Sequence, residues 1–328
     1  MKEKIRVGIA GYGNLGRGVE AAIAQSEDMT LAAVFSRRDP STVKLLDVSV
    51  PVRPLDEVAD WRGRIDVLIL CGGSRNDLPE QGPALAALFT TVDSFDTHAR
   101  IPAYFDAVDQ AAQTGDNIAI ISVGWDPGLF SINRLMGEAI LQQGATYTFW
   151  GKGLSQGHSD AVRRVSGVRG AVQYTVPVQS AIDRVRAGEQ PQLSTREKHT
   201  RDCYVVLEEG ADAHAVRQAI VTMPDYFADY DTTVTFIDDE TLRRDHGAMP
   251  HGGFVIRSGK TGQGDGQVME FSLALQSNPG FTASVLVAYA RAAYRLRQSG
   301  QTGARTVFDV APGLLSPKSP AALRQAIL

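Results

Sequence analysis

Cysteine is scarce in this sequence. The chain contains two cysteines, Cys71 and Cys203, and their wide separation matches neither a metal-binding nor a redox motif. We therefore expect two buried, inert thiols and no metal site. Thiols of this kind are typical of proteins in a reducing compartment, so the sequence favours a cytoplasmic location.

Long apolar runs and an excess of positive charge are also missing. The 328 residues include no run of about 18 apolar residues, so we expect no membrane span. The charged first stretch, "MKEKIRVGIAGYG", is unlike a signal peptide. The net charge of −4 argues against a nucleic-acid partner and against a membrane-surface patch.

The first part of the chain alternates short apolar runs with helical stretches. Such alternation predicts an α/β fold with a doubly wound parallel sheet, the Rossmann arrangement. The expected strands are 5–11, 31–36, 66–72, 90–95 and 117–124, and the expected helices start at Asn14 and span 82–89 and 103–115.

The pattern changes after "GWDPG" (124–128), where longer strands alternate polar and apolar residues. This alternation predicts a second, α+β domain with a mixed or antiparallel sheet. Its expected strands are 146–151, 173–177, 201–208, 232–238, 252–259 and 268–276. We therefore expect a dinucleotide-binding domain over 1–125 and a substrate-binding domain over 126–294, to which the resemblance described below also assigns dimerisation. A long helix over 281–300 should end at Gly300, and residues 295–328 should pack back on the first domain.

A glycine-rich turn, "GYGNLG", follows the first expected strand and opens the first helix. Gly11 would form the tight turn, Gly13 would let the backbone approach a pyrophosphate, and Gly16 would allow close helix–strand packing. The helix N-terminus would then offer N–H groups to the phosphates. The alternative is a glycine-rich turn that binds nothing.

Positive charge follows the second expected strand, where NAD-binding proteins usually carry an acidic residue. Ser36, Arg37 and Arg38 occupy these positions. Guanidinium groups match the geometry of a phosphate, so we expect NADP and not NAD as the cofactor. The alternative is a solvated basic turn.

Two carboxylates follow expected parallel strands. Asp96 and Asp126 should both lie at the ligand-binding edge of the sheet, which suggests a substrate with an ammonium group. Alternatively, Asp96 caps a helix and Asp126 forms a turn before Pro127.

The second domain offers groups that suit carboxylates. These are the polar loop 154–160, Thr175, Arg201 and His251, with Arg201 as the strongest anchor. Trp125 and Trp150 flank these stretches and could exclude water. Each group also has a simpler interpretation, as a polar strand residue, a turn histidine or a core aromatic.

Several longer segments are more specific than the glycine turn. They are "GYGNLGRGVE", "FSRR", "VDSFDTH", "SVGWDPGLFSINR", "FWGKGLSQGHSDAVRR", "MPDYF", "MPHGG" and "NPGFTAS". On these segments the chain resembles the meso-diaminopimelate D-dehydrogenases over nearly its whole length. It is most similar to the dimeric type known from actinobacterial lysine pathways, and nothing is carried over for residues 39–65.

The resemblance implies a homodimer that uses NADP to deaminate the D-centre of meso-2,6-diaminoheptanedioate (meso-diaminopimelate) oxidatively. The implied products are ammonia and L-2-amino-6-oxoheptanedioate, which is in equilibrium with tetrahydrodipicolinate. The reverse reaction would fix ammonia for the synthesis of lysine and peptidoglycan precursors.

The resemblance also assigns site residues by position. The implied substrate contacts are Asp96, Asp126, Trp150, Gln156, Gly157, Thr175, Arg201, His251 and Asn278. The cofactor contacts expected from the glycine turn and the resemblance together are Gly11, Tyr12, Gly13, Asn14, Leu15, Gly16, Ser36, Arg37, Arg38, Cys71, Gly72, Gly73, Ser74, Ser94, Phe95, Asp96, Val123, Gly124, Trp125, Asp126 and Pro127.

These positions imply roles at the reacting centre. Asp96 and Asp126 would hold the D-ammonium, and either of them is the hypothetical general base, acting directly or through a water. Gln156 and the backbone at Gly157 would take the nearby carboxylate.

The distal end of the substrate would bind to a second group of residues. Thr175, Arg201 and His251 would hold the L-carboxylate, with Asn278 beside the distal amine. This clamp would select the D-centre, because a flipped substrate leaves buried charges without partners.

Two other classes of protein are compatible with the first domain. A sugar dehydrogenase of similar build typically uses a lysine in a Glu-Lys-Pro segment, and this sequence contains no such segment. An NADP-binding redox sensor would need a partner surface and no clamp in its second domain.

Overall fold

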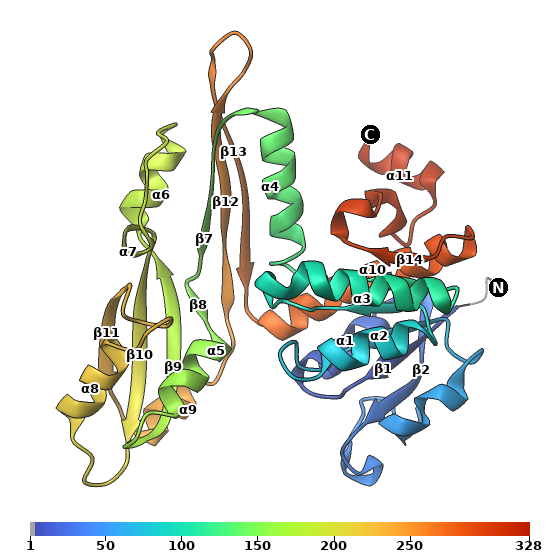
Figure 1. Ribbon diagram of the computed structural model, residues 1–328, viewed down its shortest axis with the longest axis horizontal. Coiled ribbons are helices and arrows are strands. Elements are labelled where there is room, and N and C mark those ends of the chain that lie inside the picture. The colour runs from blue at the N-terminus through green and yellow to red at the C-terminus, as the bar shows by residue number, and fades with distance from the viewer. Residues whose placement is uncertain (1–3) are drawn as a thin grey trace. The chain divides into compact units, whose positions relative to one another are not determined.

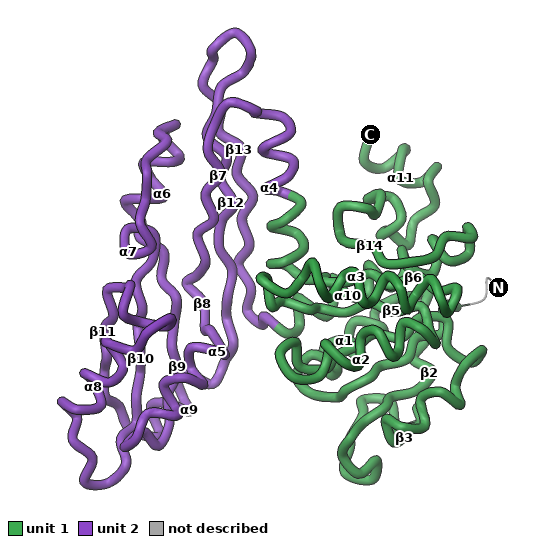
Figure 2. The backbone as a smooth tube through the Cα atoms, in the orientation of Figure 1, with its two compact units in different colours: residues 1–132, 279–328 green, residues 133–278 purple. Residues whose placement is uncertain are grey.

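The computed structural model describes residues 4–328, which form two compact units (Figure 2). Unit 1 combines the chain up to Ile132 with Pro279–Leu328, and unit 2 spans Asn133–Asn278. The chain therefore leaves unit 1 once and returns to it. The boundaries expected from the sequence, at residues 125 and 294, differ from these. The first break lies slightly later, and the second lies at the first residue of the long helix.

Unit 1 is built on a seven-stranded sheet in which neighbouring strands are parallel. The strand order is β14-β6-β5-β4-β1-β2-β3. The strands are β1 (Ile5–Ala10), β2 (Met29–Ser36), β3 (Val52–Pro54), β4 (Val67–Leu70), β5 (Thr91–Asp93), β6 (Ile118–Ile120) and β14 (Gly303–Arg305). Because β1 lies between β2 and β4, the order reverses beside β1, which is the doubly wound arrangement. The predicted fold class of this part is confirmed.

Helices cover both faces of this sheet (Figure 1). They are α1 (Asn14–Ala24), α2 (Leu78–Ala86), α3 (Ile101–Thr114) and α10 (Asn278–Gln298), while α4 (Leu129–Ile140) runs from unit 1 into unit 2. The last helix, α11 (Pro320–Ile327), has no buried residue and is not part of this cover. Successive residues of a strand point to opposite faces. In β4, Val67 and Ile69 therefore pack with α1 and α10, whereas Leu68 and Leu70 pack with α2 and α3.

Helix α10 belongs to unit 1 because of the residues it buries. Leu286, Tyr289 and Ala290 lie in the same hydrophobic cluster as Val7 and Ile9 of β1. Such a helix needs a core for its apolar face, so the unit boundary lies at its first residue. Gly300, with a φ of 78°, follows its end and supplies the left-handed residue expected there.

Unit 2 contains two sheets. The four-stranded sheet has the order β11-β10-β9-β8, and the three-stranded sheet has the order β13-β12-β7. The strands are β7 (Gln143–Trp150), β8 (Gly153–Leu154), β9 (Val168–Pro177), β10 (His199–Leu207), β11 (Asp231–Phe236), β12 (His251–Lys260) and β13 (Gly266–Leu275). The helices are α5 (Gln156–Arg163), α6 (Gln179–Arg186), α7 (Thr195–Lys198), α8 (Ala213–Val221) and α9 (Asp239–His246).

The strand pairs of unit 2 are antiparallel, apart from β10 and β11, which are parallel. Helix α8 lies between β10 and β11 in the chain, and a parallel pair requires such a crossover. The predicted mixed or antiparallel character of this part is confirmed. Among residues 4–328, no helix has the length and apolar character that crossing a membrane requires.

Candidate functional site

The glycine-rich turn follows β1 directly. Gly11 has a φ of 96°, which glycine adopts without the steric cost that a Cβ would add. A Cβ at Gly16 would lie 2.3 Å from the carbonyl oxygen of Gly11. Both positions therefore require glycine. The closest approach at Gly16 is to the turn itself, and Ile9 of the strand is the more distant neighbour at 3.5 Å.

Helix α1 begins beside an open space. Its N-cap is Gly13, which supplies no side-chain cap, and its first turn contains no acidic residue. A Cβ at Gly13 would meet no atom within 4 Å. The N-terminus of α1 therefore has room for a pyrophosphate and the positive end of a helix dipole directed at it.

The serine and arginines after β2 lie next to this turn. Ser36 is buried, and its Oγ accepts the N–H of Arg38 at 3.0 Å. The guanidinium of Arg38 donates to the main-chain carbonyl of Tyr12. Arg37 and Arg38 are both exposed, so they present positive charge beside the glycine turn. This arrangement fits the 2′-phosphate of NADP.

Asp77 is a member of this site that the sequence analysis missed. Its carboxylate receives both terminal nitrogens of Arg37, at 2.8 and 3.0 Å, and the N–H of Gly73 at 2.8 Å. The aspartate therefore joins the turn after β2 to the turn after β4. In the sequence, the position of Asp77 shortly after "CGGS" is the only sign of its contacts with Arg37 and Gly73.

The two carboxylates predicted to meet an ammonium lie at the carboxyl edge of the sheet. Asp96 follows β5 and is exposed, and its N–H donates to Ser74 Oγ at 2.8 Å. Asp126 follows β6 and is half-buried. The N-cap of the short turn His98–Arg100 is Thr97, so Asp96 does not have the capping role considered as an alternative.

Arg201 is the centre of the polar group in unit 2. It lies opposite Thr175 in the β9–β10 pair, and its Nη1 donates to the Thr175 hydroxyl. Its guanidinium carbon lies 3.8 Å from the centroid of the Tyr230 ring. Only 6% of Arg201 is exposed, and its Nε has no hydrogen bond in the described part of the chain. Burial lowers its pKa, and Tyr230 opposes that effect.

Trp150 is held by a histidine that the sequence analysis did not single out. The N–H of Trp150 donates to His199 Nε2 at 2.8 Å, and the two rings stack with centroids 5.4 Å apart. Burial, and then the charge of Arg201, lower the pKa of His199 to about 4. His199 is therefore neutral near pH 7, and its Nε2 can accept the hydrogen bond from Trp150.

The remaining predicted substrate residues lie near Met249. The side chain of Gln156 donates to Met249 Sδ at 3.1 Å, and the N–H of Asn278 donates to its carbonyl at 3.0 Å. Gly157 follows Gln156 in the exposed first turn of α5. His251 is half-buried at the start of β12, and its Nδ1 accepts the N–H of the next residue at 2.8 Å.

The structure thus groups the predicted residues within each unit. Unit 1 holds the glycine turn, the basic turn and both carboxylates, and unit 2 holds the clamp around Arg201 and Met249. Of the two cysteines expected to be buried, Cys203 is buried and Cys71 is half-buried. Desolvation raises the pKa of both thiols, that of Cys203 to about 12. Among residues 4–328, no three His, Cys, Asp or Glu side chains are grouped to hold a metal ion.

A doubly wound sheet with a glycine turn after β1, followed by an α+β unit, defines a Rossmann-fold dehydrogenase. A family model described as the diaminopimelic acid dehydrogenase C-terminal domain matches residues 124–277. The chain is 65% identical to the meso-diaminopimelate D-dehydrogenase of Ureibacillus thermosphaericus, over 99% of both sequences. The chain belongs to the meso-diaminopimelate D-dehydrogenase family.

Solved structures agree with this assignment. The DAP dehydrogenase of C. glutamicum in complex with DAP has 47% identity and a TM-score of 0.91, with 99% of each chain covered. An engineered D-amino acid dehydrogenase bound to NADP+ has 46% identity and a TM-score of 0.85, covering 99% of this chain and 100% of its own. Family membership removes the sugar dehydrogenase and redox-sensor alternatives.

Proposed function

We propose that the protein catalyses the reversible, NADP-dependent oxidative deamination of the D-centre of meso-2,6-diaminoheptanedioate. The products are L-2-amino-6-oxoheptanedioate and ammonia. This is the activity for which the family is named, and the residues of both units suit the charges of the substrate. Bound NADP supplies the two-electron acceptor for this oxidation.

Unit 1 is the cofactor half of the enzyme. The N-terminus of α1 takes the pyrophosphate, and Arg37 and Arg38 take the 2′-phosphate. The remaining expected contacts are the turns after β4, β5 and β6. The pairing of Arg37 with Asp77 leaves Arg38 as the arginine whose charge is not already matched by a carboxylate in this group.

Asp96 and Asp126 hold the ammonium of the D-centre and so orient its carbon. Removal of a proton from that nitrogen needs a base, and either carboxylate can accept the proton directly or through a water. We assign the role to this pair without dividing it between the two residues.

The observation that carries the proposal is the environment of Arg201. Arg201 is 6% exposed as a residue, and its guanidinium takes part in no ion pair formed by residues 4–328. A buried charge without a counter-ion is costly, so this position is suited to receive an anionic ligand group. Arg201, Thr175 and His251 hold the distal L-carboxylate, with Asn278 beside the distal amine. The carboxylate of the D-centre binds Gln156 and the backbone at Gly157, and Trp150 excludes water.

Assembly and location follow from the same proposal. Unit 2 exposes the apolar side chains of Leu135, Met136, Ile140 and Val268, each by 40% or more, and such side chains suit a subunit interface. We place the protein with the homodimeric type known from actinobacterial lysine pathways. Its biosynthetic substrate and its two free cysteines favour the cytoplasm. Light scattering on the purified protein measures the mass of the assembly.

The first experiment follows NADPH absorbance with the meso and LL isomers of the substrate, each with NADP and with NAD. Reduction of NADP with the meso isomer alone is the expected result. Equal rates with NAD would contradict the assignment of Arg37 and Arg38 but retain the enzyme. No reduction with the meso isomer in any combination would contradict the proposed function.

A further inference from the structure

We propose that Asp93 is a positioning residue that holds, through one carboxylate, both loops that carry Asp96 and Asp126. The inference rests on the proposed function, because it assigns to Asp93 control over the two groups that hold the D-ammonium. Asp93 itself is 1% exposed and lies beneath these loops, so it is not a contact residue.

Asp93 ends β5, and its carboxylate contacts two separate loops. Its Oδ1 accepts the N–H of Phe95 at 2.9 Å and the N–H of Ser122 at 3.1 Å. Phe95 directly precedes Asp96, and Ser122 lies in the segment that leads from β6 to Asp126. The carbonyl of Asp93 also accepts the N–H of Val123 at 2.8 Å. One residue therefore sets the spacing of the two loops.

Ser122, in the loop after β6, has an unfavourable backbone conformation that its surroundings must maintain. Ser122 has a φ of 57°, in the left-handed region that residues with a Cβ seldom occupy. Its Oγ is buried and has no hydrogen bond in the described part of the chain. The bond from its N–H to Asp93 is thus the side-chain contact that supports this conformation. Conformations of this kind persist where the surroundings fix them.

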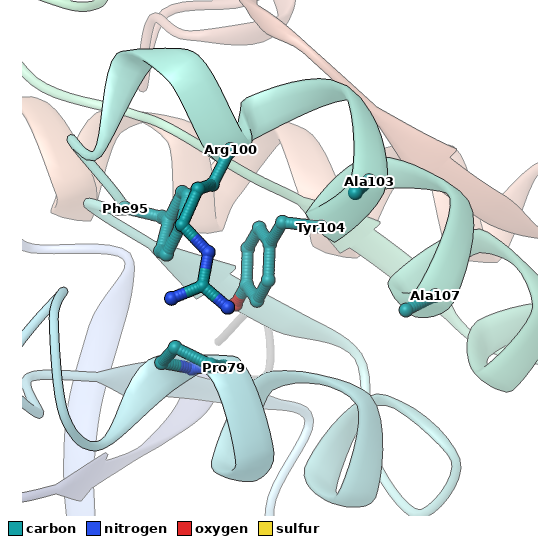
Figure 3. A pocket seen from close by; sticks show the side chains of 6 residues that line it. All are labelled: Pro79, Phe95, Arg100, Ala103, Tyr104 and Ala107. Carbon is teal, nitrogen blue, oxygen red and sulfur yellow. The ribbon is translucent and has the colours of Figure 1, made fainter.

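The second oxygen of the carboxylate is fixed from α3. The hydroxyl of Tyr104 donates to Asp93 Oδ2 at 2.7 Å, and its ring stacks on Phe95 with centroids 4.1 Å apart. Figure 3 shows these two rings beside each other, lining a cavity of about 130 Å³. A Cβ at Gly82 would lie 2.0 Å from the Tyr104 hydroxyl, so the glycine provides the space that this bond needs.

The charge of Asp93 is balanced by these hydrogen bonds alone. None of the ion pairs among residues 4–328 includes Asp93. Burial raises the pKa of the carboxyl overall, and the hydrogen bonds from the Phe95 N–H, the Tyr104 hydroxyl and the Ser122 N–H offset this rise only in part. A carboxylate is a pure acceptor, and here it meets three donors. Its removal would leave three buried donors without partners.

Displacement of either loop would move a carboxylate away from the reacting nitrogen. Rates of reactions between positioned groups fall steeply with small displacements. Cofactor affinity should change less, because the glycine turn and Ser36 to Arg38 do not depend on Asp93. A positioning role for Asp93 therefore predicts that its replacement lowers the rate of the chemical step and leaves NADPH affinity nearly constant.

The experiment compares Asp93→Ala, Asp93→Asn and Tyr104→Phe with the wild type. The matched control is Asp109→Ala, because Asp109 on α3 also accepts a backbone N–H, that of Ala304 at 2.7 Å, away from both loops. For each protein we measure NADPH binding, then kcat and KM for meso-diaminopimelate per NADPH-binding site. The primary isotope effect for substrate deuterated at the D-carbon reports the chemical step.

We expect Asp93→Ala to lower kcat/KM at least about 30-fold and to enlarge the isotope effect, because C–H cleavage becomes rate-limiting. NADPH affinity should fall by no more than about 3-fold, since the anchors of its phosphates, the glycine turn and Ser36 to Arg38, lie elsewhere and only its further contacts on the turns after β5 and β6 are disturbed. Asp93→Asn should retain activity within about 5-fold, because its oxygen can accept both N–H groups while its amide donates to the Tyr104 oxygen. Tyr104→Phe keeps the ring stack and should lower kcat about 5-fold.

Asp109→Ala should lower Tm and leave kcat, KM and the isotope effect at wild-type values. Wild-type kinetics per NADPH site in Asp93→Ala would overturn the proposal. If that variant does not fold, wild-type kinetics and isotope effect in Tyr104→Phe overturn it instead. Failure of the wild type to oxidise the substrate would overturn the proposed function, and the positioning role with it. If the wild type oxidises the substrate and only the Asp93 and Tyr104 variants lose activity, the result supports the positioning role of Asp93.

Discussion

Two buried arginines in this chain differ in what balances their charge. Arg291 is 4% exposed, and its guanidinium forms a double ion pair with Asp28 at 2.6 and 2.7 Å. Arg201 is buried to a similar extent, but within residues 4–328 it forms no ion pair, and its side chain contacts the Thr175 hydroxyl and Tyr230. The charge of Arg291 is neutralised by a residue of the same fold, Asp28. Arg201 is the arginine that we propose to bind a ligand carboxylate.

Replacement of Arg201 by Met should therefore affect substrate more than cofactor. Loss of charge-assisted hydrogen bonds costs about 2–3 kcal/mol, which corresponds to roughly a 30- to 150-fold lower kcat/KM for meso-diaminopimelate. KM should carry most of the change, and NADPH affinity should be unaltered. The control is Arg196→Met, because Arg196 lies exposed in the same unit and pairs with Asp231. Equal losses in both variants would contradict the role of Arg201.

Arg38→Ser tests the preference for NADP. The exposed guanidinium of Arg38 is held at the Tyr12 carbonyl, beside the glycine turn. Its loss should raise KM for NADP about 10-fold or more and leave KM for NAD nearly constant, because NAD lacks the 2′-phosphate. Steady-state kinetics with both cofactors provide an internal control. A parallel rise in both KM values would show a general distortion of the turn.

Candidate site residues could be proposed from the sequence where they follow strands or stand in long, specific segments. The glycine turn, the arginine pair, Asp96 and Asp126 belong to this group. Asp77, His199 and Tyr230 do not, because their importance arises from partners brought close only by the fold. Asp93 was overlooked for a related reason. Its position at the end of an apolar run does not indicate which loops its carboxylate will contact in the fold.

Helix α1 shows how one element serves both stability and binding. Gly16 meets the backbone of the turn, whereas the space beside Gly13 is open. Glycine is therefore needed at these two positions of the motif for different physical reasons. One allows the turn to close, and the other keeps the N-terminus of the helix accessible.

Alanine at these two positions should separate the effects. Gly16→Ala would force the turn apart and should reduce the free energy of unfolding by about 2 kcal/mol or more. Gly13→Ala meets no protein atom and should shift Tm by no more than about 2 °C, yet raise the Kd of NADPH at least about 10-fold. Calorimetry and fluorescence titration measure the two quantities. Unchanged NADPH affinity in Gly13→Ala would refute the location of the pyrophosphate.

Most elements could be predicted because their apolar runs are long enough to show a period. The strands β1, β2, β10 and β12 agree with their expected ranges to within two residues. The strands β3 and β14 span three residues each, as β5 and β6 do, but unlike β5 and β6 they do not lie within a longer apolar run that marks them as strands. The parallel pairing of β11 was also beyond the sequence, because alternation reports a covered face and not a strand direction.

At the scale of the molecule, Asp28 and Arg291 connect distant parts of the chain within unit 1. Asp28 lies just before β2, Arg291 lies on α10, and Arg291 Nη1 also donates to the Leu315 carbonyl at 2.8 Å. The hydrogen bond from Arg291 is the main cause that lowers the pKa of Asp28, against the opposing effect of burial. The ion pair therefore fastens the returning C-terminal segment to the sheet.

This pKa shift gives a pH dependence of stability. Because the folded-state pKa of Asp28 lies below the unfolded value of about 3.9, the stabilisation is present above that pH and is lost as the pH falls through the folded value. Asp28→Asn should therefore be less stable than the wild type at pH 7, and the difference should shrink below about pH 4. Urea unfolding across this range measures it. A difference that is constant with pH would show that the charge of Asp28 is not involved.

The path of the chain through unit 1 has a consequence for its synthesis. The strand β14 at the edge of the sheet and the helix α10 against β1 both come from residues 278–328. A ribosome therefore completes all of unit 2 before the first sheet has its last strand and its covering helix. Until then one face of the N-terminal sheet has α1 but lacks α10, so the second unit is the part that can fold first to completion during translation.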